Sequence, residues 1–281
     1  MPLGSDRQSM VFVTHIPGPP LAAFVERFWY YSGLCVAHGR ERVLPEGTFE
    51  LILNLESSPR YLYEDETGPR ATAYRRGWLS GAQTRYLVID ATPGASLMGV
   101  HFRPGGAAPF LGFPACELVD QVVEMDACWG AAADVLRETL LAAASPAAKF
   151  RVMEGFLRRR LDPDALDRRS VRYLVSRLSR SAGCGSISSL AREVGWSHKH
   201  LIDRFRKEVG VGPKRLCRIL RFQQVLRTIE SGNGVLWADL AAACGYFDQA
   251  HFIREFQAFS GLNPKRYLQE RGEYLNYVPV R

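Results

Sequence analysis

Apolar residues near the C-terminus recur at helical spacing. Phe252, Phe256 and Phe259 lie at positions i, i+4 and i+7, which form one face of a helix, while glutamine, histidine and arginine fill the positions between them. Asp248 stands before this segment, where its carboxylate can accept the free N–H groups of the first turn. A short apolar segment precedes it and ends at Gly245. The pattern predicts two helices separated by a tight turn, the second with an apolar back and a polar front.

The same pattern occurs about 50 residues upstream. Residues 190–215 align with residues 240–266, and the second copy carries one extra residue in its turn. A repeat at this level of detail indicates a duplicated structural unit. The aligned pairs include Leu190 and Leu240, Gly195 and Gly245, Ser197 and Asp248, Phe205 and Phe256, and Pro213 and Pro264. Two helices joined by a glycine turn are typical of a helix-turn-helix, whose second helix enters the DNA major groove. The alternative is an ordinary amphipathic helix pair in an α-helical core.

Two such units within about a hundred residues, the second reading GYFDQAHF and then GLNPKRY, resemble the DNA-binding domain of the AraC/XylS family of bacterial transcriptional regulators. The resemblance covers roughly residues 170–270, a little over a third of the chain. It implies that the remainder is the variable sensor half of such a regulator, which commonly uses a cupin-like barrel.

The first hundred residues favour β-strands. Short runs of strand-forming residues, separated by proline and glycine, lie at 24–33, 49–55, 60–63, 86–91 and 97–102. After residue 104 the composition becomes helical, and we expect helices over Leu118–Met125, over Trp129–Ala144 and from Pro146. The predicted fold class is therefore α+β, with an N-terminal barrel or sandwich over 11–104 and helices over 105–163.

We expect the second domain, over 164–281, to be all-α, with helix-turn-helix units at 187–209 and 236–259. A connector helix over Pro213–Glu230 would be about 27 Å long. A connector of this length would place the two recognition helices roughly 34 Å apart, which is one turn of DNA.

Charge is distributed unevenly between the halves. Residues 164–281 carry 20 Lys and Arg against 11 Asp and Glu, a formal charge of +9, whereas residues 1–163 carry 16 against 18, or −2. The excess positive charge therefore coincides with the helix-turn-helix repeat. This coincidence favours double-stranded DNA as the partner of the C-terminal half over a merely solvated surface.

The polar fronts of the two predicted recognition helices supply candidate base-reading residues. Arginine can donate two hydrogen bonds to guanine, and glutamine can pair with adenine. Asp203 is the unusual member, because it repels phosphates but can accept from cytosine N4; alternatively it pairs with Lys207 at i+4. His251 could instead have a structural role. The candidates are His198, Lys199, Ile202, Asp203 and Arg206 in the first copy and Gln249, Ala250, His251 and Arg254 in the second.

Four cations follow the recognition helices, where they could contact phosphates or simply remain solvated: Lys214, Arg215, Lys265 and Arg266.

The N-terminal half offers weaker signals. Trp29, Glu46, Glu50, His101 and Arg103 are candidate ligand-binding residues, since a histidine with carboxylates on a barrel could hold a metal or an acidic ligand. Core packing explains the aromatic residues as well. The six cysteines are scattered without a C-x-x-C pair, so we expect neither a metal site nor a cofactor.

These observations favour a sequence-specific DNA-binding transcriptional regulator that is not an enzyme. Its expected partners are promoter or operator DNA, a small-molecule effector or a second subunit in a homodimer, and RNA polymerase. No apolar run is long enough for a transmembrane helix, and the N-terminus lacks the layout of a signal peptide, so we expect a cytoplasmic protein with no membrane partner. The alternative is a cupin-type enzyme or an alkyl-transfer DNA-repair protein fused to the same DNA-binding module.

Overall fold

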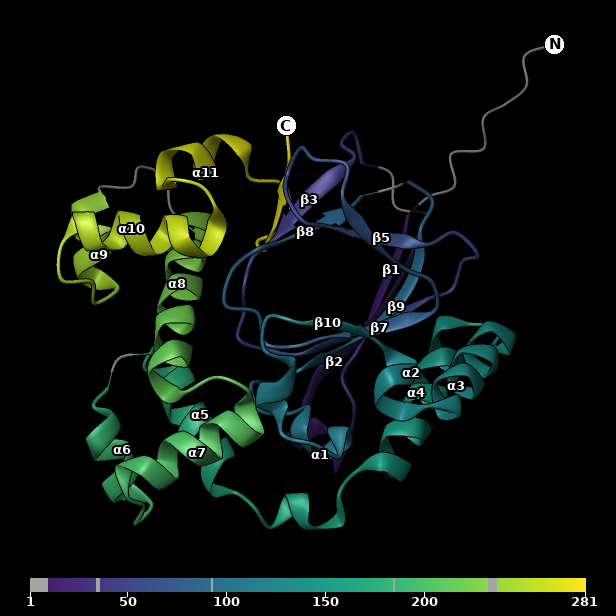
Figure 1. Ribbon diagram of the computed structural model, residues 1–281, viewed down its shortest axis with the longest axis horizontal. Helices are drawn as coiled ribbons and strands as arrows, with labels where there is room; N and C mark the ends of the chain where they lie inside the picture. The colour runs from purple at the N-terminus through teal and green to yellow at the C-terminus, as the bar shows by residue number, and fades with distance from the viewer. Residues whose placement is uncertain (1–9, 34–35, 92, 184, 232–236) are drawn as a thin grey trace.

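The computed structural model describes residues 10–33, 36–91, 93–183, 185–231 and 237–281. Two β-sheets form one side of the molecule, and the duplicated helices stand beside them as a column on the left of Figure 1. The sheets come almost entirely from the first hundred residues, which confirms the predicted β-rich first half and the α+β fold class.

All strand pairs are antiparallel. The predicted strand at 60–63 matches the observed one, and the other four predicted strands agree to within a few residues. The six-stranded sheet has the order β1 (Val11–His15), β2 (Val25–Ser32), β9 (Ser96–Phe102), β4 (Glu50–Asn54), β7 (Gly77–Ser80) and β10 (Val122–Glu124). The five-stranded sheet has the order β11 (Tyr277–Pro279), β3 (Arg40–Val43), β8 (Leu87–Asp90), β5 (Arg60–Tyr63) and β6 (Ala71–Tyr74).

The main core lies on the outer face of the six-stranded sheet. Alternate strand residues point to opposite faces, and Phe28, Leu51 and Val100 all point outward into one buried cluster with helix α4 (Pro146–Arg160). The ring of Phe150 on α4 stacks on Phe28 with centroids 6.3 Å apart. The helices therefore stabilise this sheet from outside and leave its other face turned toward the second sheet.

Two helix predictions in the first half are wrong in detail. Residues 118–125 do not form a helix, because the β-branched pair Val122 and Val123 adds a strand to the edge of β7. The expected helix over 129–144 begins only after Gly130, whose positive φ of 56° separates α2 (Met125–Trp129) from α3 (Ala131–Ala142).

The second half is helical as expected. A helix over 170–180 opens this half, and the predicted connector runs over 213–231. Its helices are α5 (Ser170–Arg180), α6 (Ile187–Glu193), α7 (His198–Val209), α8 (Pro213–Ser231), α9 (Trp237–Ala243), α10 (Gln249–Ser260) and α11 (Pro264–Glu270). The shorter elements of the first half are the 3-10 turns η1 (Leu21–Ala23), η2 (Ala115–Leu118) and η3 (Pro163–Leu166), and helix α1 (Ala108–Leu111).

The end of the chain returns to the N-terminal half, which the sequence did not predict. After α11, strand β11 pairs antiparallel with β3, so that Val278 lies opposite Arg42 and is fully buried. Backbone hydrogen bonds continue on both sides of the strand, from Leu44 to Asn276 and from Val280 to Arg40. The last residues of the helical half thus complete a sheet of the β-rich half.

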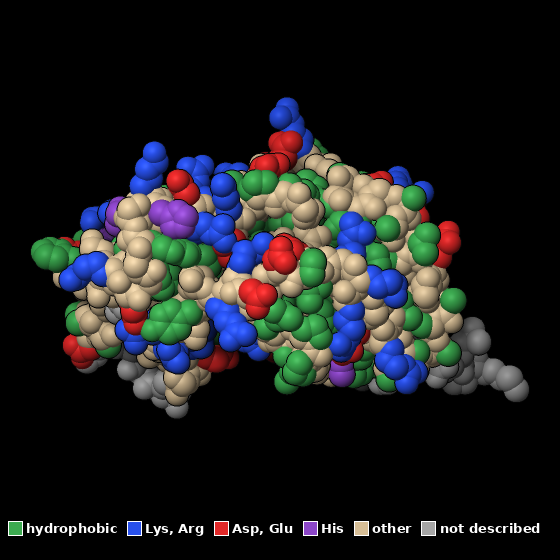
Figure 2. All heavy atoms as spheres, turned by 90° about the horizontal axis from the view of Figure 1, so that it is seen from below, with side chains coloured by type: hydrophobic (Ala, Val, Ile, Leu, Met, Phe, Trp, Pro, Cys, Tyr) green, Lys and Arg blue, Asp and Glu red, His purple; other side chains and the backbone are tan. Residues whose placement is uncertain are grey.

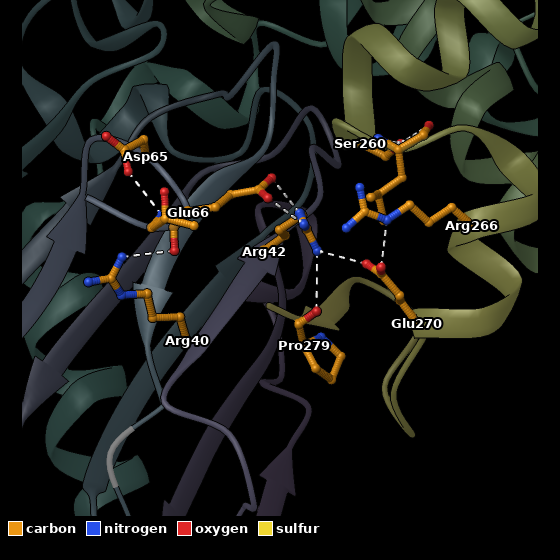
Figure 3. A network of polar contacts seen from close by, with 10 residues as sticks. Arg40, Arg42, Asp65, Glu66, Ser260, Arg266, Glu270 and Pro279 are labelled. Atoms are coloured by element: carbon orange, nitrogen blue, oxygen red, sulfur yellow. Dashed lines mark hydrogen bonds and ion pairs between the residues drawn. The ribbon is translucent and has the colours of Figure 1, made fainter. Parts of the chain in front are cut away.

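The side chain of Arg42 connects the C-terminal strand β11 and helix α11 to the β-rich half (Figure 3). Its side chain is only 1% exposed and donates two hydrogen bonds, of 2.7 and 2.6 Å, to the carboxylate of Glu66. The same guanidinium lies 3.4 Å from a Glu270 oxygen of α11 and donates to the carbonyl of Pro279 in β11 at 3.2 Å. Glu270 also accepts from Arg266 at 2.6 Å. One buried cation therefore joins β3, the 64–70 loop, β11 and α11.

We expect the substitution Arg42→Met to lower the free energy of unfolding by about 3 kcal/mol, because it leaves two carboxylates without their buried partner. Arg70→Met is the matched control: Arg70 is exposed and lies 3.8 Å from Glu64, so its loss should cost less than about 0.5 kcal/mol. Urea denaturation of both variants measures the difference. Equal stabilities would show that the Arg42 network contributes nothing.

Candidate nucleic-acid interface

The two helix-turn-helix units have the same turn hydrogen bonds. Gly195 N–H donates to Arg192 O at 3.1 Å, and Gly245 N–H donates to Ala242 O at 3.0 Å. In the next position Trp196 donates to Ala191 O and Tyr246 donates to Ala241 O, both at 2.9 Å. Both glycines have positive φ, of 70° and 74°, as this helix-ending turn requires. The repeat seen in the sequence is therefore also a repeat of backbone geometry.

Each recognition helix begins at a side-chain cap. Ser197 accepts a hydrogen bond from the N–H of His200 at 3.2 Å, and Asp248 accepts one from the N–H of His251 at 2.6 Å. The cap predicted at Asp248 is confirmed. Helix α10 ends at Gly261, whose φ of 73° is left-handed. These ends fix which residues form the exposed N-terminal turns of α7 and α10.

The apolar backs of both helices are buried. Leu201 and Phe205 of α7 are fully buried in the main core, and Phe252 and Phe256 of α10 pack edge to face at 5.8 Å in a second core. Phe256 also meets Phe222 of α8 at 5.3 Å. Because burial fixes the rotation of each helix, the polar residues between these positions face away from the core, except for the buried Glu255.

Most candidate readers lie on that outer face. His198, Lys199 and Asp203 on α7 and Gln249, Ala250 and Arg254 on α10 are exposed, together with Arg206, while Ile202 is partly buried. Within the described chain, Asp203 makes no ion pair with Lys207, so the alternative role considered for it has no support in the structure.

Three candidates have neighbours that the sequence did not reveal. His251 lies edge to face on Tyr246 at 5.5 Å and 3.7 Å from Glu255, which favours its structural interpretation. Arg206 and Arg215 line a recess of about 440 Å³ that they share with Thr84 and Asp120 of the first half, so they face the β-rich half as well as solvent.

The phosphate candidates also differ from one another. Lys214 and Lys265 are exposed and have no ion-pair partner among the residues that the structure describes, and the same is true of the readers Lys199 and Arg254. Arg266 is paired with Glu270 at 2.6 Å. Seen from the side of α6 and α7, the helical half carries many Lys and Arg side chains, with histidine among them (Figure 2). Unpaired exposed cations are the groups best suited to phosphate.

Sequence reasoning missed a buried carboxylate that orients α10. Glu255 is 6% exposed and forms an ion pair with Arg218 of α8, so it ties the second recognition helix to the connector. Its place between Arg254 and Phe256 was visible in the sequence, but its orientation was not, because an acidic residue in a helix is usually solvated.

The candidate ligand residues of the first half come together, with one exception. Glu50 on β4 accepts from Trp29 Nε1 at 2.5 Å and lies 2.6 Å from His101 Nδ1, and Glu46 lies 3.8 Å from His101 Nε2. Burial alone would lower the pKa of His101, but the charge and hydrogen bond of Glu50, with the charge of Glu46, raise it to about 9. Arg103 is apart from them: it is exposed and donates to Ala22 O at 3.1 Å.

The folded helices define a double helix-turn-helix DNA-binding module. In agreement, residues 190–270 match the family described as "Helix-turn-helix domain", and this part of the chain is similar to a helix-turn-helix of the AraC type. Residues 13–124 match the family described as "Domain of unknown function (DUF6597)".

Curated relatives match about a third of this chain. Uncharacterised HTH-type transcriptional regulators from Staphylococcus aureus strains MSSA476 and N315 are each 30% identical to this chain over 86 residues. The match covers 31% of this chain and 11% of each relative, so the chain spans about a tenth of their length.

Among solved structures, ToxT from Vibrio cholerae O395 bound to (E)-4-(8-methylnaphthalen-1-yl)but-3-enoic acid is similar with a TM-score of 0.46 and 12% identity, over 92% of this chain and 98% of that one. Wild-type ToxT with bound unsaturated fatty acid, from Vibrio cholerae strain SCE256, is similar with a TM-score of 0.45 and 9% identity, over 92% and 94%.

The described residues show neither a metal-binding group nor a membrane-spanning helix. No three His, Cys, Asp or Glu residues among them gather as a group that could hold a metal ion. None of their helices is both long and apolar enough to cross a membrane. Cys35 and Cys184 lie outside the described residues, whereas Cys217 and Cys244 are buried.

We expect Arg254→Ala to weaken binding to the preferred DNA site by about 1–3 kcal/mol and to relax the preference at one base pair, because a bidentate contact to guanine is lost. Lys265→Ala is the control, since a phosphate contact carries no base information and its loss should weaken all sequences about equally. Selection from randomised DNA with both variants separates the two roles. An unchanged base preference in Arg254→Ala would contradict the assignment.

Proposed function

We propose that this protein is a sequence-specific transcriptional regulator that binds double-stranded promoter or operator DNA through α7 and α10. The duplicated pair of capped recognition helices, each with a buried apolar back and an exposed polar front, carries this proposal. The +9 charge of residues 164–281 supports it, because DNA binding requires neutralised phosphates.

We further propose a two-part organisation in which residues 1–163 sense an effector and residues 164–281 bind DNA. The cluster of Trp29, Glu46, Glu50 and His101 supports an effector site in the first half, since carboxylates and a charged histidine are costly to bury without a role. The return of β11 to the first half supports communication between the parts. The same proposal includes RNA polymerase as a partner at the promoter and a cytoplasmic location for the protein.

If the basic half contacts phosphates, binding of the whole protein to DNA should depend strongly on salt. For about six neutralised phosphates, the slope of log K against log salt concentration should be near −5. Fluorescence anisotropy with labelled duplex DNA between about 50 and 200 mM salt measures the slope. Binding that does not change over this range, or no binding to any genomic fragment, would contradict the proposed function.

We also propose that the protein forms homodimers through β1. This strand lies at the edge of the six-stranded sheet. Phe12 within the strand is 53% exposed, and Ile16 just after it is 73% exposed. An apolar edge strand is a template for pairing with another chain, and an antiparallel pair of β1 strands would join two copies about a two-fold axis.

We expect Phe12→Glu to shift the protein from dimer to monomer, because it places two charges in the paired edge. Val135→Glu is the control, as Val135 is equally exposed, at 62%, but lies on α3. Sedimentation velocity distinguishes the species. A wild-type protein that remains monomeric at high concentration would remove the dimer from the proposal.

A further inference from the structure

The space between the two sheets is lined by residues that face inward but are not fully buried. Trp29 and Tyr31 on β2, and Trp78 on β7, point away from the outer core and pack around Ile52 and Leu97. From the other sheet, Tyr277 on β11 faces the same space and is 37% exposed. An ordinary sandwich core buries such residues completely. Here the two inner faces do not close on each other.

The space between the two sheets is enclosed by protein and is not part of the open surface. Burial raises the pKa of Tyr277 well above its usual value, and the charges of Glu50, Glu46, Tyr31 and Glu41 add to the effect. Burial also raises the pKa of Tyr31. A tyrosine that is over a third exposed and still desolvated lies in a recess, where a small molecule would meet its surface.

Several polar groups in this recess lack protein partners. The part of the chain that the structure describes offers no hydrogen-bond partner to the hydroxyls of Tyr31 and Tyr277. Among the described residues, the Glu46 carboxylate forms an ion pair only with His101 Nε2, at 3.8 Å. Burial raises the pKa of Glu46. These three groups are therefore free to bond to a polar ligand in the recess.

The charges that line the recess determine whether it favours a cationic or an anionic ligand. His101 is held between Glu50 and Glu46, so its positive charge is already compensated. Arg60 and Asp90 pair with each other at 2.9 Å, and Glu41 lies 2.6 Å from His38. The charge of Arg27 also acts on Glu46 and His101, but Arg27 is itself paired with Glu26 at 3.1 Å. Glu46 and Glu50 together therefore exceed the one remaining charge, that of His101. This excess negative charge would repel an anion, whereas a cation would compensate it.

The aromatic residues provide a flat wall beside the carboxylates. Trp29 and Tyr31 stack with ring centroids 5.6 Å apart and an angle of 8°. The indole lies against Gly99 of β9, where any Cβ would overlap the ring, so the wall stands close to the sheet. The faces of tryptophan and tyrosine attract organic cations.

We propose that the inter-sheet site, formed by Trp29, Tyr31, Glu46, Glu50, His101 and Tyr277, binds a small organic ammonium or amidinium ion that carries a flat apolar body. This inference rests on the proposed effector function of the first half and names the chemical class of the effector. The cation lies between the Glu46 and Glu50 carboxylates and the Trp29–Tyr31 wall. Tyr277 closes the site from the C-terminal strand, so the ligand contacts the segment that joins the helical half to the sheet.

Isothermal titration calorimetry on the full chain tests the proposal with 2-phenylethylammonium at neutral pH and with 2-phenylethanol as its uncharged counterpart. We expect the ammonium ion to bind at least about 10-fold more tightly than the alcohol. Glu46→Gln should weaken ammonium binding by about 10-fold or more, whereas Glu117→Gln, at an exposed position on η2, should not change it. Tyr277→Ala should weaken it as well.

The DNA affinity and melting temperature of each variant show whether it is folded. Equal binding of the ammonium ion and the alcohol, or unchanged ammonium affinity in Glu46→Gln, would overturn the inference. Binding of a neutral polyol or a carboxylate in place of the cation would also overturn it, but would leave the effector function standing. Loss of DNA binding by the wild-type protein would instead contradict the proposed function, whatever the calorimetry shows.

Discussion

The structure depends on the burial of one helix, α8, in two hydrophobic cores at once. Its Leu216 and Leu220 belong to the core of the first helix-turn-helix, and its Phe222 and Ile229 belong to the core of the second. Because both recognition helices pack on one continuous helix, neither can rotate without disturbing a core. At 1.5 Å per residue its 19 residues span about 28 Å.

The same helix also contacts the β-rich half. Gln223 is buried and donates to Pro45 O and to Asn276 Oδ1, both at 2.9 Å, so its amide joins α8 to a loop of the first half and to the segment before β11. Gly47 has no side chain where the methyl groups of Leu216 and Ile219 approach it. With the Arg42 network, these contacts make the connector, the C-terminal strand and the β-rich half parts of one packed unit.

The sequence predicted the local features well, because they depend on neighbouring residues. The cap at Asp248, the turn at Gly245 and the stripe of Phe252 and Phe256 were all visible as residue types at fixed spacing, and the repeat reinforced each of them. The sequence-based prediction failed where the local structure depends on partners that are distant in the sequence. Residues 122–124 became a strand because β7 offered an edge, and residues 277–279 did so because β3 offered another. In the candidate sites, the burial of Glu255 follows from tertiary packing and had no signal of its own, whereas Glu46, Glu50 and His101 were named together from their residue types and only their distances needed the fold.

Hydroxyl-radical footprinting of the purified protein on a DNA fragment that it binds tests the central claim most directly. If α8 holds α7 and α10 at a fixed separation, the protein should protect two patches about one helical turn apart, roughly 10 base pairs, on one face of the DNA. Arg254→Ala should weaken only the patch that α10 contacts. A single protected patch, or two patches on opposite faces of the duplex, would contradict the account.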